Sequence, residues 1–175
     1  MKVMTNPALP KLLLAVSLAA TTTAASAATE TANLGVSATV SASCAISTTA
    51  ALDFGTYDPA VANASADLDG SGTISVTCTS GAPVAITLDQ GANADAGSTD
   101  AAPARRMSDG STNYLDYTLY SDSGRTTIWG NDATVDVETT GTGTAEAHTV
   151  YGRVAAGQNV PAGSYTDTVV ATVTF

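Results

Sequence analysis

The chain closes, from Tyr165 to Phe175, with the sequence YTDTVVATVTF. A two-residue alternation runs through it: Val169, Ala171, Val173 and Phe175 are separated by Val170, Thr172 and Thr174. This period places one side of a β-strand on a core and the other side toward water. We therefore expect a last strand from Tyr165 to Phe175. It carries no charge after Asp167, although strands at a sheet edge are normally short, charged or covered.

The same alternation recurs upstream. Apolar residues alternate with mostly polar ones in three further runs: Ile74, Val76 and Cys78; Val84, Ile86 and Leu88; Leu115, Tyr117 and Leu119. The stretches between them, residues 60–72, 91–104 and 139–144, are rich in Ala, Gly, Ser, Thr, Asn and Asp and predict loops. No helical period is present. Short strands separated by such loops predict an all-β protein, an antiparallel sandwich in one domain.

The composition excludes several classes of partner. The 175 residues include 6 basic and 16 acidic residues, a net charge of −10. Both lysines, Lys2 and Lys11, lie at the extreme N-terminus, so the rest of the chain has four arginines against 16 acids, a net charge of −12. Nucleic-acid binding needs clustered Lys and Arg, and attraction to an anionic membrane surface needs them too. We expect neither partner.

Residues 1–27 have the order of parts of a secretory signal peptide. The two lysines give a positive start, Leu12–Ala20 is apolar, and Ala25-Ser26-Ala27 matches a cleavage site. The apolar run is shorter than the roughly 20 residues that span a bilayer. We expect an exported chain that begins at Ala28 and does not itself insert into a membrane.

Cys44 and Cys78 are the only two cysteines. In an oxidising compartment two cysteines most simply form one disulfide. A metal site lacks partners, because the chain has a single histidine and no second cysteine pair. We expect a Cys44–Cys78 disulfide and no metal.

A second alternating segment precedes Cys44. Residues 28–40 form an N-terminal arm in which Leu34, Val36, Ala38 and Val40 are separated by small or polar residues. One interpretation is that the arm is the first strand of its own sheet. The other is that it adds a strand to a neighbouring copy, with main-chain hydrogen bonds and alternate side chains providing the contacts.

Several motifs resemble the spore coat protein U domain family, which includes the subunits of archaic (Csu-type) chaperone–usher pili. The resemblance covers about Val36 to Phe175. It rests on LDFG at Leu52–Gly55, ISVTC at Ile74–Cys78, LDYTLYSD at Leu115–Asp122, Arg125-Thr126, Trp129-Gly130, YGRV at Tyr151–Val154, and the ending Gly163–Phe175.

This resemblance implies an incomplete immunoglobulin-like β-sandwich, here residues 41–175, that is completed by strand donation. A periplasmic chaperone would cover the vacant position, an outer-membrane usher would export the subunit, and the arm of an identical or related pilin would then replace the chaperone. On this sequence the donor residues would be Leu34, Val36, Ala38 and Val40. The acceptor groove would be bordered by Val169, Ala171, Val173 and Phe175, facing inward.

We expect no catalytic site and no cofactor. His148 is the only histidine, and we expect it in a strand over Ala145–Val154. No Gly-x-Ser-x-Gly elbow is present. Asp67–Gly72 is similar to a calcium loop but lacks the remaining acidic ligands, so we interpret it as a turn. Trp129, Tyr114, Tyr117 and Tyr120 could stack on sugars, although aromatic residues in a sandwich are by default buried anchors.

These observations favour a surface fibre subunit that supports adhesion or biofilm formation, exported through the periplasm to the cell surface or secreted. Two alternatives stay open: a secreted coat-layer protein, and a monomeric β-sandwich binding module. The sequence does not distinguish a major from a minor subunit.

Overall fold

The computed structural model describes residues 25–175. Its two parts are a segment that ends at Ala38 and a domain from Thr39 to Phe175. The predicted signal peptide, residues 1–27, lies outside the described residues except for Ala25–Ala27. Nothing in residues 25–175 forms a helix with the length and apolar character needed to span a membrane.

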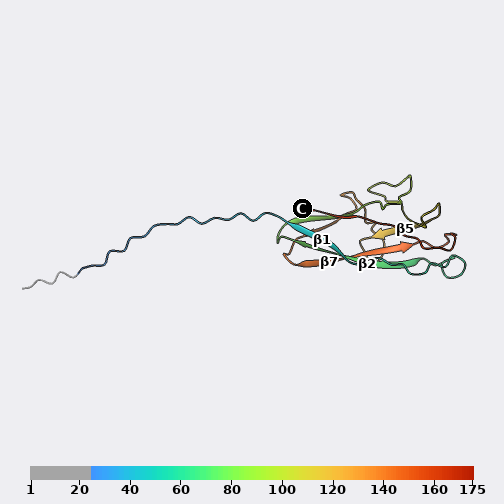
Figure 1. Cartoon of the computed structure of the whole chain (residues 1–175), viewed down its shortest axis with the longest axis horizontal. Helices are drawn as coiled ribbons and strands as arrows, with labels where there is room; N and C mark the ends of the chain where they lie inside the picture. Colours follow the sequence, from blue (N-terminus) through green and yellow to red (C-terminus); the bar gives the residue numbers. More distant parts are fainter. Residues whose placement is uncertain (1–24) are drawn as a thin grey trace, which may run out of the picture. The chain divides into compact units, whose positions relative to one another are not determined.

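The domain is a sandwich of two antiparallel sheets (Figure 1). The five-stranded sheet has the order β1-β2-β7-β5-β4, and the three-stranded sheet has the order β6-β3-β8. The strands are β1 (Cys44–Ala50), β2 (Leu68–Cys78), β3 (Pro83–Leu88), β4 (Arg105–Ser108), β5 (Tyr114–Tyr120), β6 (Val137–Thr140), β7 (Ala145–Val154) and β8 (Ala171–Thr174). The predicted all-β class is confirmed.

The core lies between the two sheets and consists of the residues that the alternation placed there. Inward-facing residues of β2, β3 and β5 are buried, among them Val76, Ile86 and Leu119. Trp129 packs into the same core, and its Nε1 donates a hydrogen bond of 2.8 Å to the Ile86 carbonyl. Full burial of a Val, Ile or Leu side chain such as these contributes about 1.5–3 kcal/mol to the stability of the fold.

The loop predicted over residues 60–72 is too long, because β2 already begins at Leu68. Gly70 and Gly72 lie within this strand. The segment that follows β1 crosses so close to them that a larger side chain would not fit. A Cβ on Gly72 would lie 2.9 Å from the Leu52 nitrogen, and one on Gly70 would lie 3.0 Å from the Phe54 ring. These glycines therefore make room for another segment rather than breaking the strand.

The predicted last strand is shorter than expected and covers only Ala171–Thr174. The preceding residues change partner along the chain. Thr166 pairs with Ser108 of β4, Thr168 accepts a hydrogen bond from Ala92, and β8 pairs with β3. A segment that passes from the edge of one sheet to the edge of the other cannot form one continuous ladder.

Cys44 and Cys78 form the predicted disulfide, at opposing positions of β1 and β2. The two cysteines are 34 residues apart in the sequence. The bond therefore ties the start of β1 to the end of β2, where the N-terminal arm joins the domain.

Replacing both cysteines with serine should lower the free energy of unfolding by about 3–4 kcal/mol, because the denatured chain loses a closed loop of this length. Urea unfolding of the exported chain and of the double variant measures the difference. Alkylation without reductant provides the control, and two reactive thiols in the native protein would contradict the assignment.

Candidate functional site

An open apolar groove of about 980 Å³ runs along one side of the domain. One wall is the end of β1 and the segment after it, Thr48–Tyr57, and the other wall is the segment Val160–Ala171. The first wall continues from β1, an edge strand that pairs only with β2 among the described strands. The second wall leads into β8, an edge strand that pairs only with β3. Strands β1 and β8 also approach each other directly.

The floor of the groove is formed by residues of the core. It consists of inward-facing residues from four strands: Ile74 of β2, Leu88 of β3, Leu115, Tyr117 and Leu119 of β5, and Val150 and Val154 of β7. All of these residues are buried. The groove is thus a place where the two sheets are not closed over their shared core.

Leu52 and Phe54, from the LDFG motif, shape one wall. A Cβ on Gly152 of β7 would lie 2.8 Å from Leu52 Cδ1 and 2.7 Å from Phe54 Cζ. Gly152 pairs directly with Gly70 of β2, so two facing glycines leave space that Phe54 occupies. Phe54 also packs edge-on against Tyr117, with ring centroids 6.0 Å apart. The LDFG and YGRV motifs stand out in the sequence, but the sequence alone did not assign Leu52, Phe54 or Gly152 to a groove.

The other wall carries a polar cluster. The Tyr117 hydroxyl donates a hydrogen bond of 2.7 Å to Asp167 Oδ2, and the Asn93 side-chain amide donates one of 3.0 Å to Asp167 Oδ1. Burial raises the pKa of the Tyr117 phenol, and the bond to Asp167 adds to the effect. The cluster fixes the segment around Asp167 to β5.

Tyr117→Phe should lower the free energy of unfolding by about 1.5–3 kcal/mol, the range for a hydrogen bond to a charged group. It should also reduce the loss of stability above pH 10. There the unfolded phenol ionises, whereas the buried one stays protonated, so the native state becomes less favourable as the pH rises. Urea unfolding at pH 7 and pH 11 measures both effects. An equal alkaline loss in Tyr114→Phe and Tyr117→Phe would contradict this explanation.

Another buried polar group, which sequence analysis did not single out, holds the end of β3. Arg105 is 1% exposed and donates hydrogen bonds from Nε to the Asp89 carbonyl and from Nη2 to the Leu88 and Trp129 carbonyls. Its burial lowers the pKa of the guanidinium. Arg105 thus satisfies three backbone carbonyls at the end of β3. Composition alone does not reveal that an arginine is buried there.

The four residues predicted to border an acceptor groove fall into three groups. Val169 and Ala171 line the groove, and Val173 is partly buried against the core. Phe175 follows the end of β8, is 53% exposed and is not among the residues that line the groove. The part of these residues in accepting a strand stays a prediction.

The arm residues are not paired as a strand. Residues 25–43 form no strand, and β1 begins at Cys44. Leu34 and Val36 are each 87% exposed and Val40 is 83% exposed; Ala38 is exposed as well. An alternating apolar segment without a partner is thus present in the same chain as an open groove.

The other candidate residues do not form a catalytic or metal site. His148 lies partly buried in β7, and residues 25–175 contain no cluster of three His, Cys, Asp or Glu side chains placed to hold a metal. Asp67–Gly72 is not the turn we expected, because β2 includes most of it. Asp69 forms a bidentate pair with Arg153 at 2.7 and 2.9 Å, and these hydrogen bonds lower the pKa of its carboxyl.

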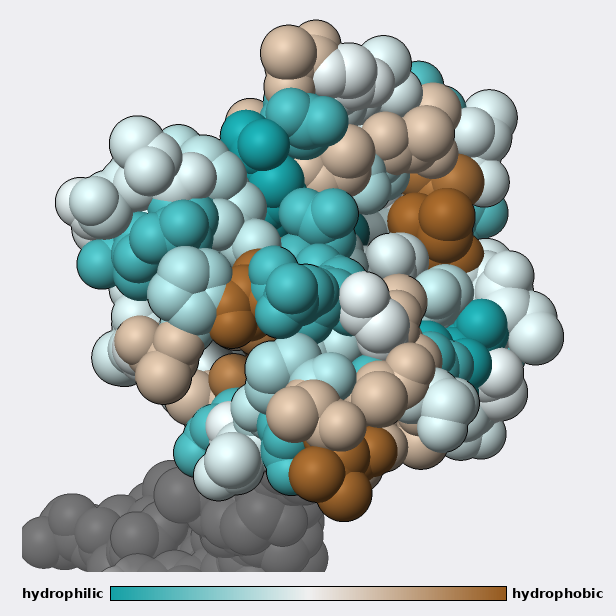
Figure 2. All heavy atoms as spheres, turned by 90° about the vertical axis from the view of Figure 1, so that its right-hand side faces the viewer, coloured by the Kyte–Doolittle hydropathy of each residue, from teal (hydrophilic) through white to brown (hydrophobic). Residues whose placement is uncertain are grey.

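The four aromatic residues considered for sugar stacking are split between the core and the surface. Trp129 and Tyr117 are buried, Tyr120 is partly buried, and Tyr114 is 37% exposed beneath the Arg106 guanidinium. Figure 2 shows one end of the domain, where hydrophilic residues predominate and hydrophobic ones form separate small patches. The aromatic residues thus form no common platform.

Comparison with known proteins gives three findings. The model of the Spore Coat Protein U domain matches residues 30–172. "Protein U" of Myxococcus xanthus is 49% identical over 157 residues, which are 86% of this chain and 88% of that protein.

The third finding is structural. The fold is similar, with a TM-score of 0.55 and 21% identity, to a chain in the CsuC–CsuE chaperone–tip adhesion subunit pre-assembly complex from the archaic chaperone–usher Csu pili of Acinetobacter baumannii. The similarity covers 78% of this chain but only 40% of that one. It supports the immunoglobulin-like description of the sandwich.

Proposed function

Because the chain belongs to the Spore Coat Protein U domain family, we propose that it is an exported structural subunit of a chaperone–usher type pilus. In this proposal the groove of one copy takes the N-terminal arm of the next. A family and a fold of this kind serve a structural role, and the chain is not an enzyme.

One observation carries the proposal: an open apolar groove between two sheet edges occurs together with an unpaired apolar arm in one chain. Adding a strand to a free edge satisfies main-chain hydrogen bonds and places alternate side chains in pockets. Full burial of Leu34 and Val36 would contribute about 1.5–3 kcal/mol for each side chain. Each copy has one arm and one groove, so the association is head-to-tail and gives an open fibre.

The partners follow from the family resemblance. A periplasmic chaperone would shield the groove before assembly, an outer-membrane usher would export the subunit, and identical or related subunits would form the joints at the cell surface. The structure with the similar fold is a complex with a chaperone, which supports a chaperone as a partner of this chain. Adhesion or biofilm formation would be the consequence of such a fibre.

Electron microscopy of surface extracts, together with size-exclusion chromatography of the purified exported chain, tests the proposal. We expect thin unbranched fibres that contain this chain, and oligomers whose size increases with concentration. A purified chain that stays monomeric at every concentration, with the amides of residues 34–40 protected from exchange, would instead favour the closed binding module.

A second candidate is a coat-layer protein, favoured by the 49% identity to Protein U over most of its length and by the name of the family. The groove and arm serve a layer as well as a fibre. Immunogold labelling of cell sections distinguishes the two, because a continuous envelope of label indicates a coat and labelled filaments indicate a pilus.

A further inference from the structure

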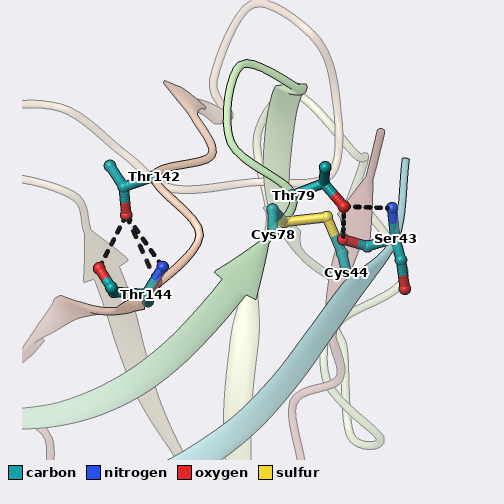
Figure 3. The surroundings of a disulfide bond; sticks show 6 residues. All are labelled: Ser43, Cys44, Cys78, Thr79, Thr142 and Thr144. Atoms are coloured by element: carbon teal, nitrogen blue, oxygen red, sulfur yellow. Dashed lines mark hydrogen bonds between the residues drawn. A yellow bond between two sulfur atoms is a disulfide. The ribbon is translucent and has the colours of Figure 1, made fainter. Parts of the chain in front are cut away.

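The arm leads into β1 through Ser43, and Thr79 forms hydrogen bonds with both backbone groups of this residue (Figure 3). The Ser43 amide donates a hydrogen bond of 3.0 Å to Thr79 Oγ1. The Ser43 carbonyl accepts one bond of 2.9 Å from the Thr79 amide and another of 3.3 Å from the Thr79 hydroxyl. One threonine thus satisfies both backbone groups of Ser43, the residue immediately before β1.

Thr79 is itself fixed by its surroundings. It follows Cys78, whose disulfide to Cys44 lies directly beside the Ser43–Thr79 pair (Figure 3). The turn after β6 packs against it: the Gly143 amide donates a hydrogen bond of 2.9 Å to the Cys78 carbonyl. A Cβ on Gly141 would collide with the Thr79 carbonyl and lie 2.8 Å from Cys78 Cβ. The Ser43 contact is therefore made by a rigid part of the domain.

The arm becomes unconstrained immediately before this point. Val40, the last apolar residue of the predicted donor segment, is 83% exposed. Ser41 and Ala42 are the residues between Val40 and the held Ser43, and both are exposed.

We infer that Thr79 clamps the root of the arm, so that the joint between consecutive subunits is reduced to Ser41 and Ala42 and the fibre is stiff. This inference rests on the proposed function, since a joint exists only where the arm of one copy occupies the groove of another. Without the Thr79 hydroxyl, the Ser43 amide would lose its partner, and only the bond from the Thr79 amide to the Ser43 carbonyl would remain. The amide side of Ser43 would then belong to the flexible segment. A flexible joint would then lengthen from on the order of 8 Å to on the order of 10 Å, and each domain could swing more widely on its neighbour.

The test compares three variants of the full exported chain. Thr79→Val removes the hydroxyl but keeps the shape and the branched Cβ. Thr79→Ser keeps the hydroxyl and serves as the rescue. Thr142→Val is the matched control, because Thr142 is an exposed threonine in the adjacent turn whose hydroxyl bonds only within that turn, to Thr144 (Figure 3).

Amide hydrogen exchange of Ser43 is the direct measurement. We expect roughly fivefold faster exchange in Thr79→Val, the factor that corresponds to the loss of one hydrogen bond, and rates like the wild type in Thr79→Ser and Thr142→Val. Unchanged exchange of Ser43 in Thr79→Val would overturn the clamp, whether or not fibres form.

The persistence length of negatively stained fibres is the second measurement. Thr79→Val fibres should bend more than those of the wild type, Thr79→Ser and Thr142→Val. Faster exchange combined with unchanged stiffness would overturn the joint, while the pilus function would stand. A wild-type chain that forms no fibres would instead refute the proposed function, and the exchange rates would still decide whether Thr79 clamps Ser43.

Discussion

Fibres are not expected from a chain in which Leu34 and Val36 are both replaced with aspartate. The two side chains are 87% exposed in the unassembled subunit, so the substitutions should change the free energy of unfolding by less than about 0.5 kcal/mol. In an assembled joint they would bring two charges into a groove whose floor is entirely apolar or aromatic. Burial of unpaired charges is costly enough to prevent the association.

The matched control for this variant is Val61→Asp. Val61 is 77% exposed, but it lies outside both the arm and the groove lining. The Val61→Asp substitution also replaces an apolar side chain with a charged one, and it should leave fibre length unchanged. Electron microscopy after equal incubation gives the comparison, and a deletion of residues 29–40 should match the double aspartate variant. Fibres of wild-type length from either arm variant would refute the donor role of the arm.

Ala171→Trp should block the groove without unfolding the domain. Ala171 faces the open groove from β8, where a large side chain finds free space instead of a filled core. Such a subunit keeps its arm and can donate, but it cannot accept. Thr172→Trp is the control, because Thr172 is the exposed neighbour on the other side of the same strand.

Mixing the two classes of variant gives the strongest result. Neither Ala171→Trp nor the deletion of residues 29–40 should polymerise alone. Together they should form heterodimers that stop at two subunits, because the intact arm of the first fills the open groove of the second and no further ends remain. Size-exclusion chromatography with light scattering measures the product. The absence of heterodimers from two folded variants would show that the arm and the groove do not pair.

The two predictions separate the roles of the arm and of the groove. Both depend on features that a single chain carries at distant positions, Leu34 to Val40 in the arm and Val160 to Ala171 in one groove wall. A closed binding module would show neither effect, since its arm would be paired within its own sheet and its groove would be filled.

Much of the fold could be predicted from local pattern. The alternation around Val76, Ile86 and Leu119 identified strands and their buried sides correctly, because side-chain direction in a strand depends only on a two-residue period. The disulfide between Cys44 and Cys78 was predicted from cysteine number and export. The arm and the last strand were also recognised as unusual edges, since long uncharged strands at an edge are rare.

Local pattern did not locate the groove. Its two walls, Thr48–Tyr57 and Val160–Ala171, lie more than 100 positions apart in the sequence, and no period connects them. The glycines of β2 were taken for a loop because a single sequence does not show that Leu52 and Phe54 occupy the space above Gly70, Gly72 and Gly152.

Local side-chain chemistry was therefore enough to place the strands around Val76, Ile86 and Leu119 with their buried sides, to pair the two cysteines and to identify an alternating apolar arm, because each of these follows from a few neighbouring residues. It left open whether the arm is paired within its own sheet. The packed domain was needed to show where the two sheets stay open, where the last segment changes sheets between Thr166 and Val170, and that Thr79 holds Ser43. These features depend on contacts between segments far apart in the chain, and such contacts are set by the packing of the whole domain.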